Sequence, residues 1–443
     1  MSRLPKGWLE TTLGEVVDYG TTLKAEPDEI SDDEWVLELE DIEKDKSRIV
    51  SRLTFADRKS KSTKNRFSKG DVLYGKLRPY LNKVVLADSN GLCTTEIIPI
   101  KQTAAVDNRY VFHWLRGPRF LSYAIGVSHG LNMPRLGTDA GRSAPFILPP
   151  LAEQKRIADK LDSVLSRVEA ACARMGRVPT ILTRLRRAAL VATLLGQDGD
   201  AKPTPRIAFG SLINSIRGGT TAVPQSDKTA YPILRSSSVR QGRIDFEDVR
   251  YLTSEQSGEE KNFIRENDVL FTRLNGNVNY VGNCAVVPSV SLNKYQYPDR
   301  LYCARLKETI VPKYCAYAFA LPDIRKEIER RAKSSAGHKR ISIQDIKEME
   351  IPLPPVAEQL RMVNQIERIF ATCDRLEKTL DEAKIVADHL TPALLAKAFR
   401  GELVGQDPND ESAEQLLERL KALTTSLGTK GKRSRQSATA AEI

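Results

Sequence analysis

The chain has 443 residues, of which 41% are hydrophobic and 28% are charged, and these numbers predict a water-soluble protein of two to four domains. No apolar stretch reaches the roughly 20 residues of a membrane span and the first residues lack a signal-peptide core, so we expect a cytoplasmic protein with no membrane partner. Six dispersed cysteines without a C-x-x-C pair argue against disulfide or zinc scaffolds, and the net charge of +11 favours a polyanionic partner such as nucleic acid.

An internal repeat organises the chain. LPPLAEQ at 148–154 returns as LPPVAEQ at 353–359, and DVLYGKL at 71–77 returns as DVLFTRL at 268–274. Each half reads as a mixed segment of strands and a helix, followed by a long helix. The sequence therefore predicts an α+β fold with a pseudo-twofold internal repeat.

The first mixed segment, 1–147, contains short strand patterns at 35–39 and 72–77 and an amphipathic helix pattern at 108–124. GDVLYGK resembles a phosphate-binding loop, but Leu77 replaces the hydroxyl residue that such a loop needs. The second copy also replaces the two glycines with Asn267 and Thr272. We therefore predict a buried strand here rather than a phosphate cradle.

The helical segments, 148–197 and 352–404, have apolar residues at alternating steps of four and three, which is typical of a coiled coil. Pro179 and Pro392 are expected to kink these helices. Residues 151–197 hold nine Lys/Arg against four Asp/Glu, and residues 356–402 hold seven against eight, so the two helices suit pairing with each other. We interpret the pairing as antiparallel, and the residues leave parallel packing open.

The remaining segments complete the predicted organisation. A polar linker spans 198–206, and the second mixed segment, 207–351, repeats the strand patterns at 232–234 and 269–274 and the helix pattern at 312–331. A short amphipathic helix is expected within 405–427, with Leu416, Leu417, Leu420 and Leu423 on one face, and a basic disordered tail at 428–443.

Catalytic motifs do not emerge from the sequence. The pattern Pro-Asp followed by Asp-x-Lys, which restriction nucleases use, occurs in each half but at places that the repeat does not relate. The Pro-Pro pairs lack the flanking residues of an amino-methyltransferase loop, and the four histidines lack motif context. We therefore predict no catalytic residue and no metal ligand in this chain, which looks like a binding protein.

The repeated helices carry a family resemblance. LPPLAEQKRIADKLDSVLSRV at 148–168, LPPVAEQLRMVNQIERIFATCDRL at 353–376 and AFRGELV at 398–404 resemble the conserved regions of the specificity subunit of type I restriction–modification systems. The resemblance implies two target-recognition domains joined by two helices that form an antiparallel coiled coil. Each domain would read one half of a bipartite, asymmetric DNA site, and the coiled coil would set the spacer. The first helix departs from the family pattern, since it ends TLLGQ where AFxGEL is usual.

The resemblance also implies partners. Two methyltransferase subunits would bind S-adenosylmethionine and methylate adenine at N6, and two restriction subunits would use ATP and Mg²⁺ to cleave unmodified double-stranded DNA. The chain itself would hold no cofactor. The alternative is a DNA scaffold or adaptor without sequence specificity, which the stronger divergence of the two mixed segments relative to the helices disfavours.

Candidate contact residues follow from the repeat. Basic, aromatic and amide side chains after the repeated strand, and before each final strand, suit contacts to phosphates, guanine and adenine. These predicted DNA contacts are Lys76, Arg78, Tyr80, Lys83, Arg135, Arg273, Asn275, Asn277, Lys339 and Arg340. Polar residues repeated at the two helix entrances favour either partner docking or helix capping. They are Glu153, Gln154, Arg156, Glu358, Gln359 and Arg361.

Overall fold

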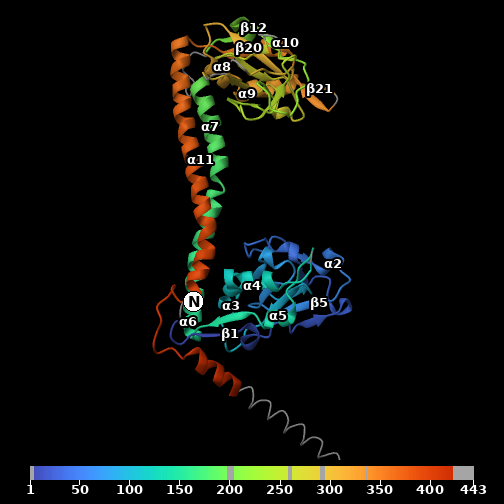
Figure 1. Cartoon of the computed structure of the whole chain (residues 1–443), viewed down its shortest axis with the longest axis vertical. Helices are drawn as coiled ribbons and strands as arrows, with labels where there is room; N and C mark the ends of the chain where they lie inside the picture. The colour runs from blue at the N-terminus through green and yellow to red at the C-terminus, as the bar shows by residue number, and fades with distance from the viewer. Residues whose placement is uncertain are drawn as a thin grey trace, which may run out of the picture. The chain divides into compact units, whose positions relative to one another are not determined.

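The computed structural model describes residues 4–130, 132–196, 204–257, 262–289, 295–335 and 337–422 (Figure 1). The chain divides into two compact units: unit 1 comprises 1–175 and 382–443, and unit 2 comprises 176–381. Most of the predicted linker, the predicted tail at 428–443 and Leu423 lie outside the described residues.

The first and last strands of the mixed segment of unit 1 pair with each other: β1 (Leu9–Thr12) is antiparallel to β10 (Pro145–Leu148). Its other strands form a five-stranded sheet in the order β2-β5-β8-β3-β4 and a three-stranded sheet in the order β7-β6-β9. Their bounds are β2 Leu23–Ala25, β3 Trp35–Leu37, β4 Leu53–Thr54, β5 Lys64–Phe67, β6 Val72–Gly75, β7 Val84–Leu86, β8 Gly91–Thr94 and β9 Ile97–Ile100.

The helix predicted at 108–124 is two helices, α3 (Asn108–Arg116) and α4 (Pro118–Val127). Pro118 lacks the N–H that would continue α3, and its fixed φ suits the first turn of a new helix. The short helices of this unit are α1 Leu13–Val16, α2 Phe55–Arg58 and α5 Thr138–Arg142.

Unit 2 has the same pairing, with β11 (Arg206–Ala208) antiparallel to β23 (Glu350–Pro352). It contains a four-stranded sheet in the order β12-β20-β17-β19, a three-stranded sheet in the order β18-β22-β21, and the pairs β13-β16 and β14-β15. The bounds are β12 Ile213–Gly218, β13 Tyr231–Leu234, β14 Val239–Arg240, β15 Arg243–Ile244, β16 Val249–Leu252, β17 Val269–Thr272, β18 Leu274–Asn275, β19 Cys284–Val286, β20 Leu301–Leu306, β21 Lys333–Ser335 and β22 His338–Arg340.

The helices of unit 2 repeat those of unit 1. α8 (Pro312–Ala318) and α9 (Pro322–Arg331) occupy the range predicted as one helix, and Pro322 begins the second as Pro118 does in unit 1. α10 (Ile343–Lys347) corresponds in chain order to α5.

The repeated motif forms the central strand of a shared frame. In unit 1, Val72 of β6 pairs with Leu86 and with Ile100 on its two sides. In unit 2, Val269 of β17 pairs with Val286 and Ala304 in the same arrangement. The structure confirms that GDVLYGK leads into a buried strand.

The long helices are α6 (Leu151–Met175), α7 (Val178–Leu195) and α11 (Val356–Ala398). The expected kink at Pro179 is instead a break, because the first helical segment ends at Met175 and Pro179 lies in the first turn of α7. Pro392 lies inside α11, which continues through it.

Helix pairing within unit 2 is antiparallel, and Figure 1 shows α7 and α11 side by side there. The Arg186 guanidinium contacts Asp374 at 2.6 Å and Glu377 at 2.7 Å, whereas Leu194, further along α7, shares a core with Met362, which lies earlier on α11. Basic α7 thus meets acidic groups of α11, as the charge counts predicted.

In unit 1, residues near the start of α6 and the end of α11 share a core with the mixed segment. The Phe399 ring, just after α11, lies 4.8 Å from Trp114 and 5.6 Å from Tyr110 between ring centroids. A helix at 413–422 packs on the same core through Ala413 and Leu417, and Ala413 donates its N–H to the Gly7 carbonyl at 2.9 Å.

Candidate nucleic-acid interface

Two predicted contact residues that are far apart in the sequence meet in unit 1. Lys76 follows β6, and its N–H donates to the Glu96 carbonyl at 3.0 Å. Its own carbonyl accepts from Leu136 N–H at 3.0 Å, and Leu77 forms a β-bridge with Arg135. Backbone pairing thus gathers Lys76, Glu96 and Arg135, which we call the unit 1 junction.

The same backbone arrangement recurs in unit 2. Arg273 follows β17, its N–H donates to the Arg300 carbonyl at 2.9 Å, and its carbonyl accepts from Ile341 N–H at 3.0 Å. β18 pairs with β22, so that Asn275 faces Lys339 and Leu274 faces Arg340. Arg273, Arg300 and Arg340 form the unit 2 junction.

The predicted contacts of unit 1 differ in how free their side chains are. Lys83 donates from Nζ to the Leu39 carbonyl at 2.6 Å, and burial lowers the pKa of its ammonium group. Arg78 is half-buried, with a left-handed backbone (φ 51°) fixed by its N–H bond to the Pro134 carbonyl at 2.7 Å. Tyr80 is 45% exposed. Lys83 therefore stabilises the unit from within through its bond to Leu39, whereas the Tyr80 side chain faces solvent.

The two asparagines of unit 2 build turns. The Asn275 side-chain oxygen accepts from Asn277 N–H, and the Asn277 oxygen accepts from Asn279 N–H, both at 3.0 Å. Bidentate pairing with adenine needs both the oxygen and the amino group of an amide. To pair with adenine in that way, each side-chain oxygen would have to accept a second hydrogen bond or give up its bond to the turn N–H.

Arg300 and Glu96 were missed by the sequence reasoning. Each immediately precedes a buried strand, β9 at Ile97 or β20 at Leu301, that pairs with the repeated strand. Aligning these two strands would have found them, but neither strand was among the patterns recognised in the sequence.

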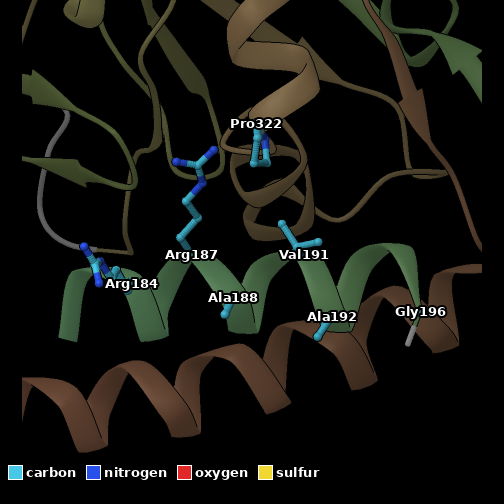
Figure 2. A pocket seen from close by; sticks show the side chains of 7 residues that line it. All are labelled: Arg184, Arg187, Ala188, Val191, Ala192, Gly196 and Pro322. Atoms are coloured by element: carbon cyan, nitrogen blue, oxygen red, sulfur yellow. The ribbon is translucent and has the colours of Figure 1, made fainter. Parts of the chain in front are cut away.

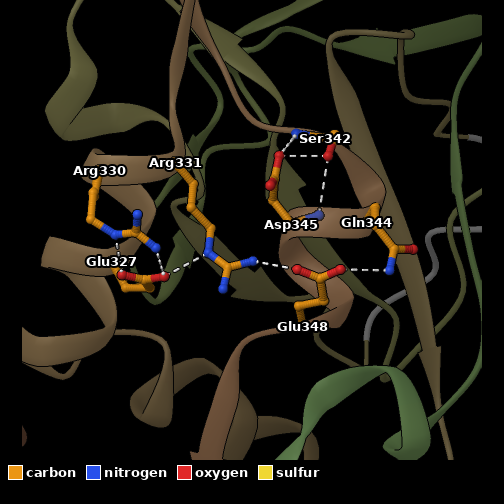
Figure 3. Close-up of polar contacts among 7 residues, drawn as sticks. All are labelled: Glu327, Arg330, Arg331, Ser342, Gln344, Asp345 and Glu348. Carbon is orange, nitrogen blue, oxygen red and sulfur yellow. Dashed lines mark hydrogen bonds and ion pairs between the residues drawn. The ribbon is translucent and has the colours of Figure 1, made fainter.

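A polar network braces the hairpin that carries Lys339 and Arg340 (Figure 3). Arg331, at the end of α9, contacts Glu327 at 2.6 Å and Glu348, just after α10, at 2.7 Å. On α10, Ser342 and Asp345 form a reciprocal cap. Since β21 and β22 lie between α9 and α10, the Arg331–Glu348 bond joins the two ends of the hairpin segment.

The repeated glutamines at the helix entrances are buried in equivalent networks. Gln154 accepts from Asp107 N–H at 3.0 Å and donates to the carbonyls of Ala105 and Pro149 at 3.1 and 3.0 Å. Gln359 likewise accepts from Val311 N–H at 2.8 Å and donates to the carbonyls of Thr309 and Pro354 at 3.1 and 2.8 Å. Both amides are fully used inside their own units and are not available to a partner.

The charged residues predicted beside them fall into two groups. Glu153 is buried and accepts from Trp8 Nε1 at 2.9 Å, and desolvation raises the pKa of its carboxyl group. Arg156 pairs with Asp410 at 2.6 Å. Glu358 is paired within its helix to Arg361, whose side chain is 65% exposed. Glu358 and Arg361 are therefore exposed enough for a partner subunit to contact them. Glu153 instead bonds α6 to Trp8 of its own domain.

A separate groove of about 550 Å³ lies between α7 and the start of α9 in unit 2 (Figure 2). Ala188, Val191 and Pro322 give it an apolar lining, and Arg184 and Arg187 add positive charge. Its lining does not include any residue of the unit 2 junction.

No described helix has the length and apolarity to cross a membrane. No group of three or more His, Cys, Asp or Glu side chains among these residues is arranged to hold a metal ion.

Comparison with known proteins finds a family match in both halves. The model of the type I restriction modification DNA specificity domain matches residues 5–171 and 209–384. The EcoKI specificity subunit of Escherichia coli K12 is 34% identical over 337 residues, covering 72% of this chain and 73% of that protein. The EcoBI specificity subunit of Escherichia coli is 28% identical over 371 residues, covering 76% of each chain.

Solved structures share the fold. A chain from a study of complex assembly and conformational transition of the type I R-M system aligns with TM-score 0.72 at 21% identity, covering 91% of this chain and 100% of that one. The HsdS subunit from Thermoanaerobacter tengcongensis aligns with TM-score 0.62 at 20% identity, covering 90% and 98%.

Proposed function

The chain belongs to the type I restriction–modification DNA specificity family, and from this premise we propose that each unit reads one half of a bipartite, asymmetric DNA sequence. One observation carries the proposal. The two junctions are held by matching backbone hydrogen bonds, yet they differ at two of their three side chains: Lys76 and Glu96 in unit 1 stand where unit 2 has Arg273 and Arg300. A common scaffold with different exposed groups suits two readers of different half-sites.

Phosphate contacts and base contacts divide between these side chains by their chemistry. Lys76 and Lys339 suit phosphates, which dominate affinity and its salt dependence. Arg273 and Arg340 suit phosphates or guanine, and Arg135, whose Nε is paired with Glu96, suits guanine. Exposed Tyr80 suits contact with the sugar–phosphate backbone. Lys83 and Arg78 support the surface from within.

The long helices set the spacer in this proposal. α11 is one helix of 43 residues, or about 65 Å at 1.5 Å per residue. Its antiparallel contact with α7 is fixed by Arg186 and by a shared core in unit 2. A stiff element of this kind would hold the gap between the half-sites constant.

Catalysis belongs to partners in this proposal. Two methyltransferase subunits with S-adenosylmethionine would methylate adenine N6, and two restriction subunits with ATP and Mg²⁺ would cleave unmodified DNA in the cytoplasm. This chain would recognise the DNA sequence and hold no cofactor.

Docking of the methyltransferase at the start of α11 is tested by charge reversal. Glu358→Arg with Arg361→Glu preserves the net charge and exchanges the two signs. Co-purification should fall at least about fivefold if the exposed pair docks the partner, which corresponds to roughly 1 kcal/mol. Unchanged assembly would assign the pair to helix capping alone. Gln225→Leu serves as an exposed control.

A methylome tests the main proposal. The chain is expressed with its methyltransferase partner in an unmethylated host, and N6-methyladenine is mapped by long-read sequencing. One bipartite motif with a fixed gap, lost when this gene alone is deleted, is the expected result. An assembled complex that methylates without any motif would favour the non-specific scaffold instead.

A further inference from the structure

The unit 2 junction borders a solvent-open cavity of about 220 Å³ that is lined by Arg273, Leu274, Arg300, His338 and Arg340. Three separate chain segments meet there. Backbone bonds hold them in place, because Arg273 N–H donates to the Arg300 carbonyl and Leu274 pairs with Arg340 across the strands.

Three arginines line this cavity, and acidic groups offset their charge only in part. Arg273 donates to the Asp299 carbonyl at 3.1 Å and lies 3.4 Å from the Asp299 carboxylate. In the described part of the chain, neither Arg300 nor Arg340 has an ion-pair partner. Asp345 adds a carboxylate on α10, where it caps the helix through Ser342. The cavity therefore has a net positive charge.

In unit 1, the position equivalent to Arg300 carries a carboxylate, which neutralises the neighbouring arginine. Glu96 occupies the place of Arg300, since each offers its carbonyl to the residue that follows the repeated strand. The Glu96 carboxylate accepts from Arg135 Nε at 3.1 Å, and Arg135 is the residue that corresponds to Arg340. At this position unit 1 has a carboxylate that pairs with Arg135, whereas unit 2 has a guanidinium that adds to the positive charge of the cavity.

We propose that the unit 2 cavity holds one phosphate group of the DNA backbone, and that unit 1 has no equivalent phosphate site. Planar guanidinium groups bind phosphate oxygens through paired N–H donors, and three arginines line this one cavity. The bound phosphate would fix the register of unit 2 on its half-site without specifying a base. This inference rests on the proposed function, because the phosphate belongs to the DNA that the chain reads.

The test uses the full chain with its methyltransferase partner and the duplex identified by the methylome. Single methylphosphonates, which remove the charge of one phosphate, are placed at each position along the unit 2 half-site. One position should weaken binding about tenfold, the size of a lost charge-assisted hydrogen bond. The effect should disappear in Arg300→Ala/Arg340→Ala, which already lacks the contact.

Three further variants sharpen this test. Arg300→Glu copies unit 1 and should weaken binding to all duplexes and reduce the slope of log affinity against log salt by about one. Arg300→Lys should keep most of that slope. Arg243→Ala removes an exposed arginine of unit 2 that is outside the cavity lining, and should leave the methylphosphonate effect intact.

The failures of the two proposals are distinguishable. If the complex does not discriminate the identified duplex from a scrambled one, the proposed function fails, and this inference fails with it. If it discriminates, but no methylphosphonate effect depends on Arg300 and Arg340, the phosphate site alone is overturned. Thermal stabilisation of the wild type by inorganic phosphate, absent in the double variant and without any methylphosphonate effect, would assign the cavity to free phosphate and also overturn it.

Discussion

Units 1 and 2 share a frame and differ at its exposed edge. Matching buried groups hold the frame: Gln154 and Gln359 make corresponding sets of three hydrogen bonds, and Tyr110 and Tyr314 each donate to a carbonyl near the last strand at 2.8 Å. The differences are concentrated at the junctions, where Glu96 corresponds to Arg300. The glutamines and tyrosines that hold the frame are thus repeated, whereas the charge at one position of the exposed edge is reversed.

The largest expected effect tests how each domain is fixed to its helix. Phe399→Ala in unit 1 should lower the free energy of unfolding by about 4 kcal/mol, and Leu194→Ala in unit 2 by about 3 kcal/mol. Phe399 and Leu194 are 8% and 1% exposed, and both lie in the main core of their unit. Denaturant unfolding followed by hydrogen exchange would separate the units. If either substitution lowered the stability of both units equally, or of neither, the claim that these residues anchor their own domains would be contradicted.

The next effect tests the glutamine networks. Gln154→Leu and Gln359→Leu should each destabilise their own unit by about 3 kcal/mol, because each leaves an N–H and two carbonyls without their partner in a buried or partly buried network. Gln225→Leu, at an exposed position, should cost under about 0.5 kcal/mol. Unequal losses from Gln154→Leu and Gln359→Leu, differing by more than the control effect, would show that the two networks are not equivalent.

A smaller effect should appear in unit 1 alone. Trp8→Phe removes the only hydrogen bond recorded for the buried Glu153 side chain among the described residues. The expected cost is about 1–2 kcal/mol. Glu358→Ala, at the corresponding position of unit 2, breaks an exposed pair and should cost under about 1 kcal/mol. A larger loss from Glu358→Ala would reverse the comparison.

The smallest effect concerns pH. His113 of unit 1 is buried beside Asp162, Arg109 and Arg116, and desolvation lowers its pKa despite the hydrogen bond to Asp162 at 2.8 Å. Its counterpart in unit 2 is Tyr317, whose pKa burial raises to about 12, so it does not titrate near neutrality. The unfolded chain binds a proton on His113 first as the pH falls, so unit 1 loses stability below the ordinary pKa of about 6.5.

Melting curves at pH 7 and pH 5.5 would measure this loss. The Tm of unit 1 should fall by about 2 °C from this group, and His113→Tyr should remove that part of the pH dependence. A pH dependence identical in the wild type and the variant would exclude His113 as its source.

Sequence reasoning recovered the repeated strand and the long helices because both leave periodic apolar patterns. It placed Val72 and Val269 in strands, and the structure confirms this. It extended single helices through Pro118 and Pro322, because the amphipathic pattern continues on both sides of each proline while the backbone hydrogen bonds do not.

The site was less predictable, because its residues meet partners that lie far away along the chain. Gln154 looks the same in sequence whether it faces a partner or a buried carbonyl, and its partners Ala105 and Asp107 are distant along the chain. Arg300 had no motif to mark it, because its importance depends on the neighbouring Arg273 and Arg340. Repetition identified the right regions, and only the fold showed which side chains are exposed in them.

A hybrid methylome tests the central claim most directly. Residues 207–351 would be replaced by the corresponding segment of another family member with a different motif, leaving unit 1 and the helices unchanged. The account predicts that one half of the methylated motif changes while the other half and the gap persist. A hybrid that assembles and methylates with both halves changed, or with neither changed, would contradict the assignment of one half-site to each unit.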